Sequence, residues 1–288
     1  MIPLEKPFYD LDGWGGNYTD DFGVDWVVTE EDGWSSAPSA RTDMTDAERR
    51  DGADDAPTFE ASRVITLSGT AIAPDWIEQN RAKDRLNGVA YRSRGLHRLV
   101  VTEHHATRYA DVRRSGASKV ADRPGFAFDF TLSLVAPDPR RYAVTETTLT
   151  TTLRGIAVDV GRSYPRRYPL VYPAATSTSP VVPYENVGTH DTGLRLKFTG
   201  GLDRPGVIDV GSGRTLQFGL RLAEGDVLDV DTLAQTVVLN GTASRRGSLI
   251  SGSTWIMLNP GAGQIRLTGA PTGAGVPSLT VSFRSAWK

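Results

Sequence analysis

The chain has 288 residues, with 32 Lys and Arg against 34 Asp and Glu, and it contains no cysteine. The absence of cysteine excludes disulfides, thiolate metal sites and cysteine nucleophiles, and a net charge of −2 argues against a dedicated nucleic-acid binder. A hydrophobic content of 39% is typical of a soluble globular protein, and the length suits one large or two ordinary domains.

The first sixty residues are acidic, with sixteen Asp and Glu against four Lys and Arg. Within them, residues 22–29 are predicted to form a strand, because Val24, Trp26 and Val28 alternate onto one face. Residues 37–57 are rich in Asp and Ala and contain no aromatic residue. We interpret this acidic stretch as an exposed loop whose role the sequence does not reveal.

A strand and a helix are predicted next. Residues 63–72 are β-rich and are interrupted by Gly69, a candidate bulge. The helix should run from Pro74 to about Asn87, with Pro74 at its first position and Gly88 at its C-terminal cap. Its expected apolar stripe consists of Trp76, Ile77, Ala82, Leu86 and Val89.

Three further strands are predicted at 95–103, 107–113 and 126–136, with a long hairpin tip at 114–124. Between Arg81 and Arg123 the charge reverses, with eleven Lys and Arg against four Asp and Glu. These cations are expected to pair with the acidic first sixty residues, within a domain or between neighbouring subunits. The candidate subunit-interface residues are Arg81, Arg85, Arg113, Arg114, Lys119 and Arg123.

A second region begins near residue 143. Its Thr-rich start reads as a linker or an exposed strand, and residues 164–183 are Pro-rich and extended. Short strands then follow at regular spacing and predict an all-β sandwich, with Asn240-Gly241 as a hairpin turn. Those strands are 194–198, 206–209, 215–222, 227–231, 237–239, 253–258, 264–268 and 278–283. The predicted organisation is thus a domain at 1–142, a linker or first strands at 143–183, and a domain at 184–288.

No constellation of catalytic residues is recognisable. His104 and His105 point to opposite faces at a strand end, and no Gly-x-Ser-x-Gly elbow or phosphate-binding loop occurs. We therefore expect no enzyme activity, no metal and no cofactor. Trp76, Trp255 and Trp287 are interpreted as structural anchors and not as exposed sugar-stacking rings. No apolar run is long enough for membrane insertion, and the N-terminus lacks a signal-peptide pattern.

Two segments resemble a known family. The first is an apolar strand that ends in Ala136-Pro137-Asp138-Pro139-Arg140-Arg141-Tyr142. The second is the succession Asp229-Val230-Asp231-Thr232, Leu239-Asn240-Gly241, Ser253-Thr254-Trp255 and Leu258-Asn259-Pro260-Gly261, closed by Phe283-Arg284-Ser285-Ala286-Trp287. Together they are similar to the distal tail proteins of long-tailed siphophages, especially those of actinobacterial hosts. Ala262-Gly263 departs from the family, which often carries Asn there.

The resemblance implies a mainly β fold. The N-terminal belt domain would be a β-sandwich with one α-helix and a long hairpin, and the C-terminal domain a galectin-like β-sandwich that faces outward. Such proteins form a hexameric ring at the distal tail tip of the virion, after synthesis in the host cytoplasm. Their partners are the tail tube protein, the tail-tip hub protein, the tape measure protein and host-adhesion or receptor-binding proteins, with host glycans as an open addition.

DNA passing through such a ring should not be held, so we expect the basic residues 81–123 to face a neighbour and not the lumen. Sequence-specific nucleic-acid binding is not expected. Two alternatives stay open at this point. One is a carbohydrate-binding β-sandwich module of a surface or secreted protein, and the other is a different tail-tip or baseplate component of similar architecture.

Overall fold

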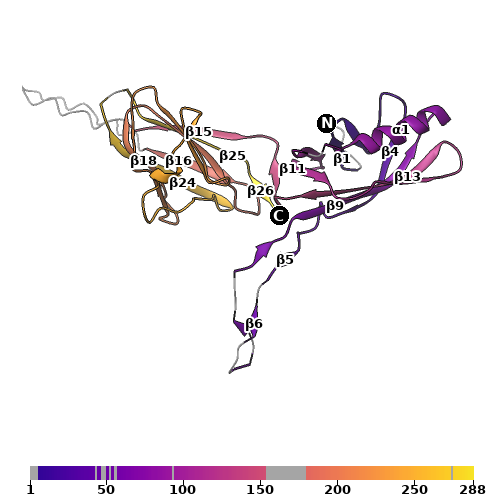
Figure 1. Cartoon of the computed structure of the whole chain (residues 1–288), viewed down its shortest axis with the longest axis horizontal. Coiled ribbons are helices and arrows are strands. Elements are labelled where there is room, and N and C mark those ends of the chain that lie inside the picture. Colours follow the sequence, from indigo (N-terminus) through magenta and orange to yellow (C-terminus); the bar gives the residue numbers. More distant parts are fainter. Residues whose placement is uncertain are drawn as a thin grey trace, which may run out of the picture. The chain divides into compact units, whose positions relative to one another are not determined.

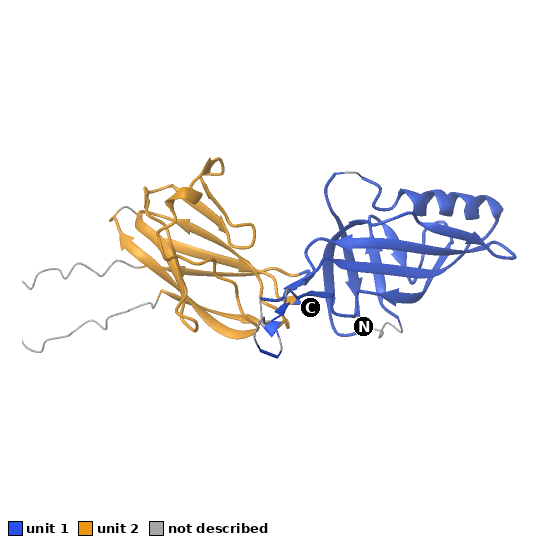
Figure 2. Cartoon of the chain, turned by 60° about the horizontal axis from the view of Figure 1, so that its bottom comes forward, with its two compact units in different colours: residues 1–144, 287–288 blue, residues 145–286 orange. Residues whose placement is uncertain are grey.

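The computed structural model describes residues 6–42, 44–46, 50–51, 53–54, 57–92, 94–153, 180–273 and 275–288. The chain divides into two compact units, shown in Figure 2. Unit 1 comprises Met1–Val144 together with Trp287–Lys288, and unit 2 comprises Thr145–Ala286. Within the predicted connecting segment 143–183, Thr147–Thr152 form a strand of unit 2, and residues 154–179 lie outside the described residues.

Unit 1 is built on one folded antiparallel sheet (Figure 1). Its strands follow the order β2-β1-β10-β11-β13-β9-β4-β3, while β12 pairs with β13, and β14 pairs with β11 and β26. Their bounds are β1 (Phe8–Leu11), β2 (Trp14–Gly16), β3 (Tyr18–Thr19), β4 (Asp25–Asp32), β9 (Arg63–Ile72), β10 (His97–Thr102), β11 (Thr107–Arg114), β12 (Lys119–Asp122), β13 (Ala127–Ala136), β14 (Arg141–Ala143) and β26 (Ala286–Trp287).

Strand β11 turns the sheet into two layers. Its residues Thr107 to Val112 pair with β10, whereas Arg113 and Arg114 pair with Val135 and Leu134 of β13. A strand that changes partner in this way makes the corner of a sandwich. The expected N-terminal β-sandwich is therefore confirmed.

The core of unit 1 follows the predicted alternation of its strands. Every second residue of β13 is buried, from Phe128 to Ala136. Trp26 meets the rings of Phe128 and Phe130 edge-on, with centroids 5.8 and 5.5 Å apart. The bulge expected at Gly69 lies instead in the partner strand β4, whose register with β9 shifts between Val28 and Glu30.

Helix α1 (Trp76–Gly88) forms where it was predicted but begins and packs differently. Asp75 is its N-cap and accepts a hydrogen bond from the backbone N–H of Glu78 at 2.8 Å, so Pro74 precedes the cap and the predicted first position is wrong. Trp76 is 58% exposed and Ile77 65% exposed. The predicted apolar stripe is therefore wrong at its N-terminal end, where Glu78 and Gln79 are buried instead.

The described residues between 37 and 60 form a paired arm and not the predicted loop. In this arm, β5 (Ala40–Arg41) pairs with β8 (Phe59–Glu60), and β6 (Thr45–Asp46) pairs with β7 (Ala53–Asp54). Figure 1 shows the arm leaving the body of unit 1. Every side chain between residues 39 and 59 whose burial is described is exposed. Because these strands have no buried face, their apolar residues do not alternate, and the sequence therefore predicts a loop here.

Unit 2 consists of two antiparallel sheets with the large buried side chains between them. The first sheet has the order β15 (Thr147–Thr152), β25 (Ser278–Phe283), β17 (Leu194–Thr199), β21 (Val227–Asp231), β22 (Thr236–Leu239) and β23 (Ala243–Ser244). The second has the order β16 (Val181–Asn186), β24 (Gly261–Pro271), β18 (Leu202–Asp209) and β19 (Thr215–Gln217), with β20 (Arg221–Leu222) paired to β18. The predicted second β-sandwich is confirmed, and a short 3₁₀ helix, η1, spans Arg246–Ser248.

Two local predictions in unit 2 had different outcomes. Asn240 and Gly241 have φ angles of 52° and 74° and join β22 to β23, so the predicted hairpin turn is confirmed. The predicted strand 253–258 is wrong, since only Leu258 makes an isolated bridge, to Thr192. Its side chains still enter the core, because Ile256 and Leu258 are fully buried.

A side-chain hydrogen bond closes the segment that follows β13. The Tyr142 hydroxyl donates to Asp138 Oδ2 at 2.6 Å. Burial and the Asp138 carboxylate raise the pKa of Tyr142. A raised folded-state pKa means that this stabilisation is complete while the unfolded tyrosine is still protonated, below about pH 10, and is lost at higher pH.

We expect Tyr142→Phe to lower the free energy of unfolding by about 1 kcal/mol at about pH 8, through loss of this hydrogen bond. The difference from wild type should shrink toward about pH 11, because only the wild type loses stability as unfolded Tyr142 ionises. Urea unfolding across this range measures both. Tyr91→Phe, at a 72% exposed position, is the control and should change little at any pH. A gap for Tyr142→Phe that stays constant with pH would contradict the expectation.

Candidate functional site

Helix α1 separates two groups of charged residues. On one flank, Arg85 Nη2 lies 3.2 Å from Asp20 Oδ2, and the guanidinium lies over the Phe22 ring at 4.3 Å. On the other flank, Lys83 pairs with Asp122 of β12. Residues two apart on a helix are separated by about 200° around its axis, so Lys83 and Arg85 necessarily face opposite sides.

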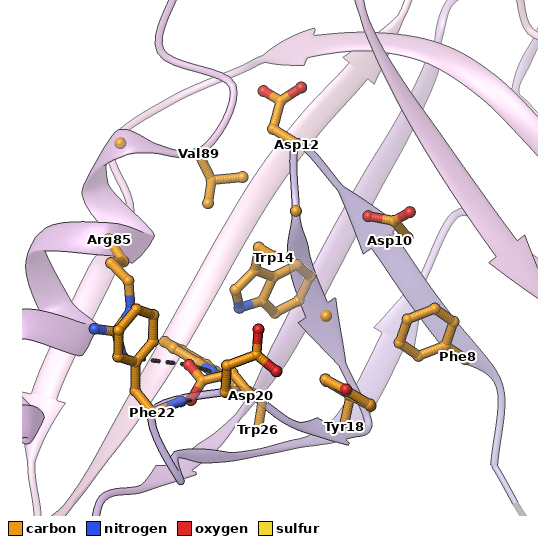
Figure 3. Close-up of a pocket in the computed structure, with 14 residues that line it drawn as sticks. Phe8, Asp10, Asp12, Trp14, Tyr18, Asp20, Phe22, Trp26, Arg85 and Val89 are labelled. Carbon is orange, nitrogen blue, oxygen red and sulfur yellow. Dashed lines mark hydrogen bonds and ion pairs between the residues drawn. The ribbon is translucent and has the colours of Figure 1, made fainter.

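On the Arg85 flank lies a pocket of about 570 Å³, which we call the aspartate pocket (Figure 3). The β1–β2 hairpin, the turn between β3 and β4 and the C-terminal end of α1 surround it. Its lining combines carboxylates with aromatic rings and consists of Phe8, Asp10, Asp12, Gly13, Trp14, Gly15, Tyr18, Asp20, Asp21, Phe22, Trp26, Arg85, Gly88 and Val89. Four aspartates against one arginine make the pocket negative.

The β1–β2 hairpin places two of these side chains by its turn chemistry. Asp12 and Gly13 have φ angles of 53° and 82°, which is the two-residue hairpin turn that Asp-Gly favours. Asp12 Oδ2 then accepts from His97 Nδ1 at 2.6 Å and from the Ala90 N–H at 3.3 Å. Trp14, just after the turn, points into the pocket wall.

Asp20 organises the opposite wall. Its Oδ1 accepts from the N–H groups of Phe22 and Val24 at 3.0 and 2.9 Å, and its Oδ2 accepts from Trp26 Nε1 at 3.1 Å as well as from Arg85. The acceptors of Asp20 are therefore used inside the chain.

Asp10, Asp21 and Trp14 differ from Asp20 in that their polar groups are unused. Neither the Asp10 nor the Asp21 carboxylate accepts a hydrogen bond from any described residue. Trp14 is 5% exposed, and its Nε1 donor has no partner among the described residues. Figure 3 shows this nitrogen on the side of the indole that faces Arg85 and Asp20. The aspartate pocket thus retains two carboxylates and one buried N–H donor for a partner.

Three of the predicted interface arginines are engaged inside unit 1. Besides Arg85, Arg114 Nη1 donates to the Asn87 carbonyl at 2.9 Å and helps to cap the C-terminal end of α1. Arg123 Nε lies 2.7 Å from Asp129 Oδ2, and hydrogen bonds from Thr70 and Arg123 lower the pKa of Asp129.

The other three predicted interface residues reach solvent. Arg81 makes a 3.5 Å contact with Glu78, while Arg113 and Lys119 are exposed and have no charged partner among the described residues. Arg113 in β11 and Lys119 in β12 both lie on strands that pair antiparallel with β13. We call residues 113–135, in which the end of β11 and β12 run back along β13, the basic hairpin. That any of the six residues contacts another subunit stays a prediction.

The three predicted tryptophan anchors are buried to different degrees. Trp76 is exposed and meets Phe126 edge-on at 5.2 Å, so it does not belong to the core. Trp255 is half-buried against the core of unit 2. Trp287 is half-buried in unit 1 with the Arg108 guanidinium 5.4 Å from its ring.

Unit 2 carries a groove of about 470 Å³ on its six-stranded sheet. Ion pairs cross it between neighbouring strands, Arg195 to Asp231 at 3.5 Å and Lys197 to Asp229 at 3.9 Å. No aromatic side chain lines this groove, although exposed rings are the feature by which a sugar-stacking face would be recognised. The carbohydrate-binding alternative therefore gains no support from it.

The part of the chain that the structure describes holds no group of three or more His, Cys, Asp or Glu that could bind a metal ion. In the same residues, no helix is both long and apolar enough to cross a membrane.

Residues 187–287 match the family model described as the siphovirus-type tail component, C-terminal domain. The Dit protein of phage SPP1 aligns over 99% of this chain and 100% of its own length, with a TM-score of 0.67 and 16% identity. The expected resemblance to siphophage distal tail proteins is confirmed. None of the curated proteins matches the sequence.

The tail component domain contains the second of the two segments on which the resemblance was based, from Asp229 to Trp287. The likeness to phage SPP1 Dit extends to unit 1 and concerns the fold alone at this identity. Two structures of the phage P2 baseplate in its activated conformation also align, with TM-scores of 0.47 and 0.46 at 11% and 12% identity, over 96% of this chain and 98% of theirs. An actinobacterial host stays a prediction.

Proposed function

We propose that this chain is a structural subunit of a hexameric ring at the distal end of a siphophage tail tube. The observation that carries the proposal is the tail component domain at residues 187–287, in a chain that shares its fold with phage SPP1 Dit over 99% of its length. Phage SPP1 Dit is described as a paradigm of the hub adsorption apparatus in phages that infect Gram-positive bacteria. By analogy, the ring joins the tail tube protein to the tail-tip hub and host-adhesion proteins, and it is not an enzyme.

The charge distribution of unit 1 supports assembly from identical subunits. A ring is built from head-to-tail contacts, which need two different and complementary patches on each copy. Unit 1 carries the negative aspartate pocket on one flank of α1 and the basic hairpin near the other. The tape measure protein and then DNA pass through the lumen of the ring, and basic residues there would hold the DNA. These basic residues are therefore expected at contacts between subunits.

Six chains of 31.1 kDa should give a particle of about 187 kDa by light scattering, with a central hole in negative-stain images. The double variant Arg113→Gln, Lys119→Gln should dissociate at a protein concentration about tenfold higher than wild type, because two interface charges are removed. Arg195→Gln, at a 74% exposed side chain of unit 2, is the matched control. An unchanged hexamer in the double variant would exclude these two residues from the interface, and a wild-type monomer at every concentration would count against the ring.

A further inference from the structure

We propose that the aspartate pocket of one copy receives the basic hairpin of a second copy. The side chain that enters the pocket is Lys119 or Arg113, and the carboxylates that bind it are those of Asp21 and Asp10. This inference rests on the proposed ring and assigns the two surfaces that meet in it. The hairpin is the guest, and the pocket beside the C-terminal end of α1 is the host.

The chemistry of the pocket selects the kind of guest. The free carboxylates of Asp10 and Asp21 attract a cation, whereas the buried N–H of Trp14 needs an acceptor. A metal ion or a polyamine supplies no acceptor oxygen. A polypeptide segment that carries a basic side chain supplies both a cation and backbone carbonyls, and so it fits both needs.

Arg85 already shows how a cation is held on this surface. Its guanidinium is bound by the Asp20 carboxylate at 3.2 Å and lies over the Phe22 ring at 4.3 Å. Asp10 and Asp21 line the same pocket as the rings of Phe8 and Tyr18, which meet edge-on at 5.7 Å. A second cation can therefore be bound by the same combination of carboxylate and ring.

The basic hairpin has the chemistry that the pocket selects. Arg113 and Lys119 are exposed on the side of the hairpin that pairs with β13, and the short polar run Ser115-Gly116-Ala117-Ser118 lies between them. The hairpin is held against the C-terminal end of α1, because Arg114 donates to Asn87 O and Ser118 Oγ donates to Asn87 Oδ1 at 2.6 Å. Its charged side chains are thus presented on strands that are supported by β13 and α1, and not on a free loop.

The placement of the two surfaces fits a head-to-tail contact. Lys83 faces the hairpin strand β12 through Asp122, and Arg85 faces the pocket through Asp20. Since these residues point to opposite sides of α1, the hairpin and the pocket of one copy can engage two different neighbours.

The chain has no cysteine, so a cross-link can be directed to this contact. Two single variants, Asp21→Cys and Lys119→Cys, are mixed as full-length proteins and treated with a short bis-maleimide. The proposal predicts a product that contains one chain of each variant. The control replaces Asp21→Cys with Ser212→Cys, an exposed position on a turn of unit 2, and should give no such product. Equal linking in the control would overturn the proposal.

An exchange of charges between the two surfaces tests the same contact without a cross-linking reagent. Asp21→Lys alone and Lys119→Glu alone should each weaken association about tenfold, and their combination in one chain should restore it. Both positions are exposed, so these substitutions should not lower the folding stability of the chain. Wild-type rings with neither cross-link nor restoration would overturn the hairpin–pocket contact while the ring stands. A wild-type monomer at every concentration, with no cross-link, would overturn both.

Discussion

Arg63→Met should destabilise unit 1 by about 4 kcal/mol, the largest effect that we expect from a single substitution in this unit. Arg63 is 1% exposed, and its guanidinium donates to four backbone carbonyls. Nε donates to Pro139 O at 2.8 Å, and Nη1 donates to Gly33 O, Trp34 O and Ser36 O at 2.5, 3.2 and 2.6 Å. One side chain therefore ties the turn after β4 to the turn after β13.

The size of the effect follows from what the substitution leaves behind. Methionine fills much of the space but donates nothing, so buried carbonyls lose their partner at a cost of about 1–3 kcal/mol each where water does not replace it. Burial lowers the pKa of Arg63, because the charged guanidinium loses its solvation. This desolvation cost offsets part of the benefit of the hydrogen bonds.

Urea unfolding followed by tryptophan fluorescence measures this loss, because Trp14, Trp26 and Trp34 lie in the core of unit 1. Arg98→Met is the control. The Arg98 side chain is 52% exposed and pairs with Asp111 on the surface, so less than about 1 kcal/mol should be lost. A loss of that small size for Arg63→Met as well would show that the carbonyls find other partners.

Asn186→Leu should destabilise unit 2 by about 3 kcal/mol for a related reason. Asn186 is fully buried, and its Nδ2 donates to His190 O at 2.8 Å and to Leu258 O at 3.3 Å. Its Oδ1 accepts from the N–H groups of Gly188 and Ala286 at 3.1 and 3.4 Å. The amide thus pairs four backbone groups from segments far apart in the sequence.

Leucine has nearly the same volume but satisfies none of these groups, so packing and hydrogen bonding are separated in this test. Thermal and urea unfolding of the full chain give the loss. Thr148→Val removes the exposed Thr148–Ser282 hydroxyl contact of 3.1 Å and should cost less than about 1 kcal/mol. If Asn186→Leu matched Thr148→Val, the buried amide would contribute little to unit 2.

The aspartate pocket shows how far the sequence could lead toward a candidate site. The Asp12-Gly13-Trp14 tripeptide and the acidic character of the first sixty residues were visible, and Asp-Gly indicates a hairpin turn. The pairing of Asp20 with Arg85, 65 residues apart, was not visible in the sequence, because no local pattern encodes which distant charges meet. The same limit applies to the basic stretch, since Arg114 became a helix cap while Lys119 stayed exposed.

Helix α1 and the arm show the same limit for the fold. The start of the helix is encoded locally by Asp75, whose side chain caps Glu78. Its buried face is not, because Gln79 turns inward to donate to Ala127 O at 2.8 Å while Trp76 stays at the surface beside Phe126. The arm at 37–57 escaped prediction because paired strands without a buried face show no alternation.

Local sequence patterns were enough to predict the elements with a buried face or a specific turn, such as β13 with its alternating Phe128, Phe130 and Leu132, and the Asn240-Gly241 hairpin. They also predicted two β-rich units and, through the motif ending at Trp287, the likeness to tail components. Which charges are paired inside the chain, and which stay open to a partner, became visible in the folded structure alone. Periodicity and turn preferences act over a few neighbouring residues, whereas hydrogen bonding and charge pairing depend on which distant strands become adjacent.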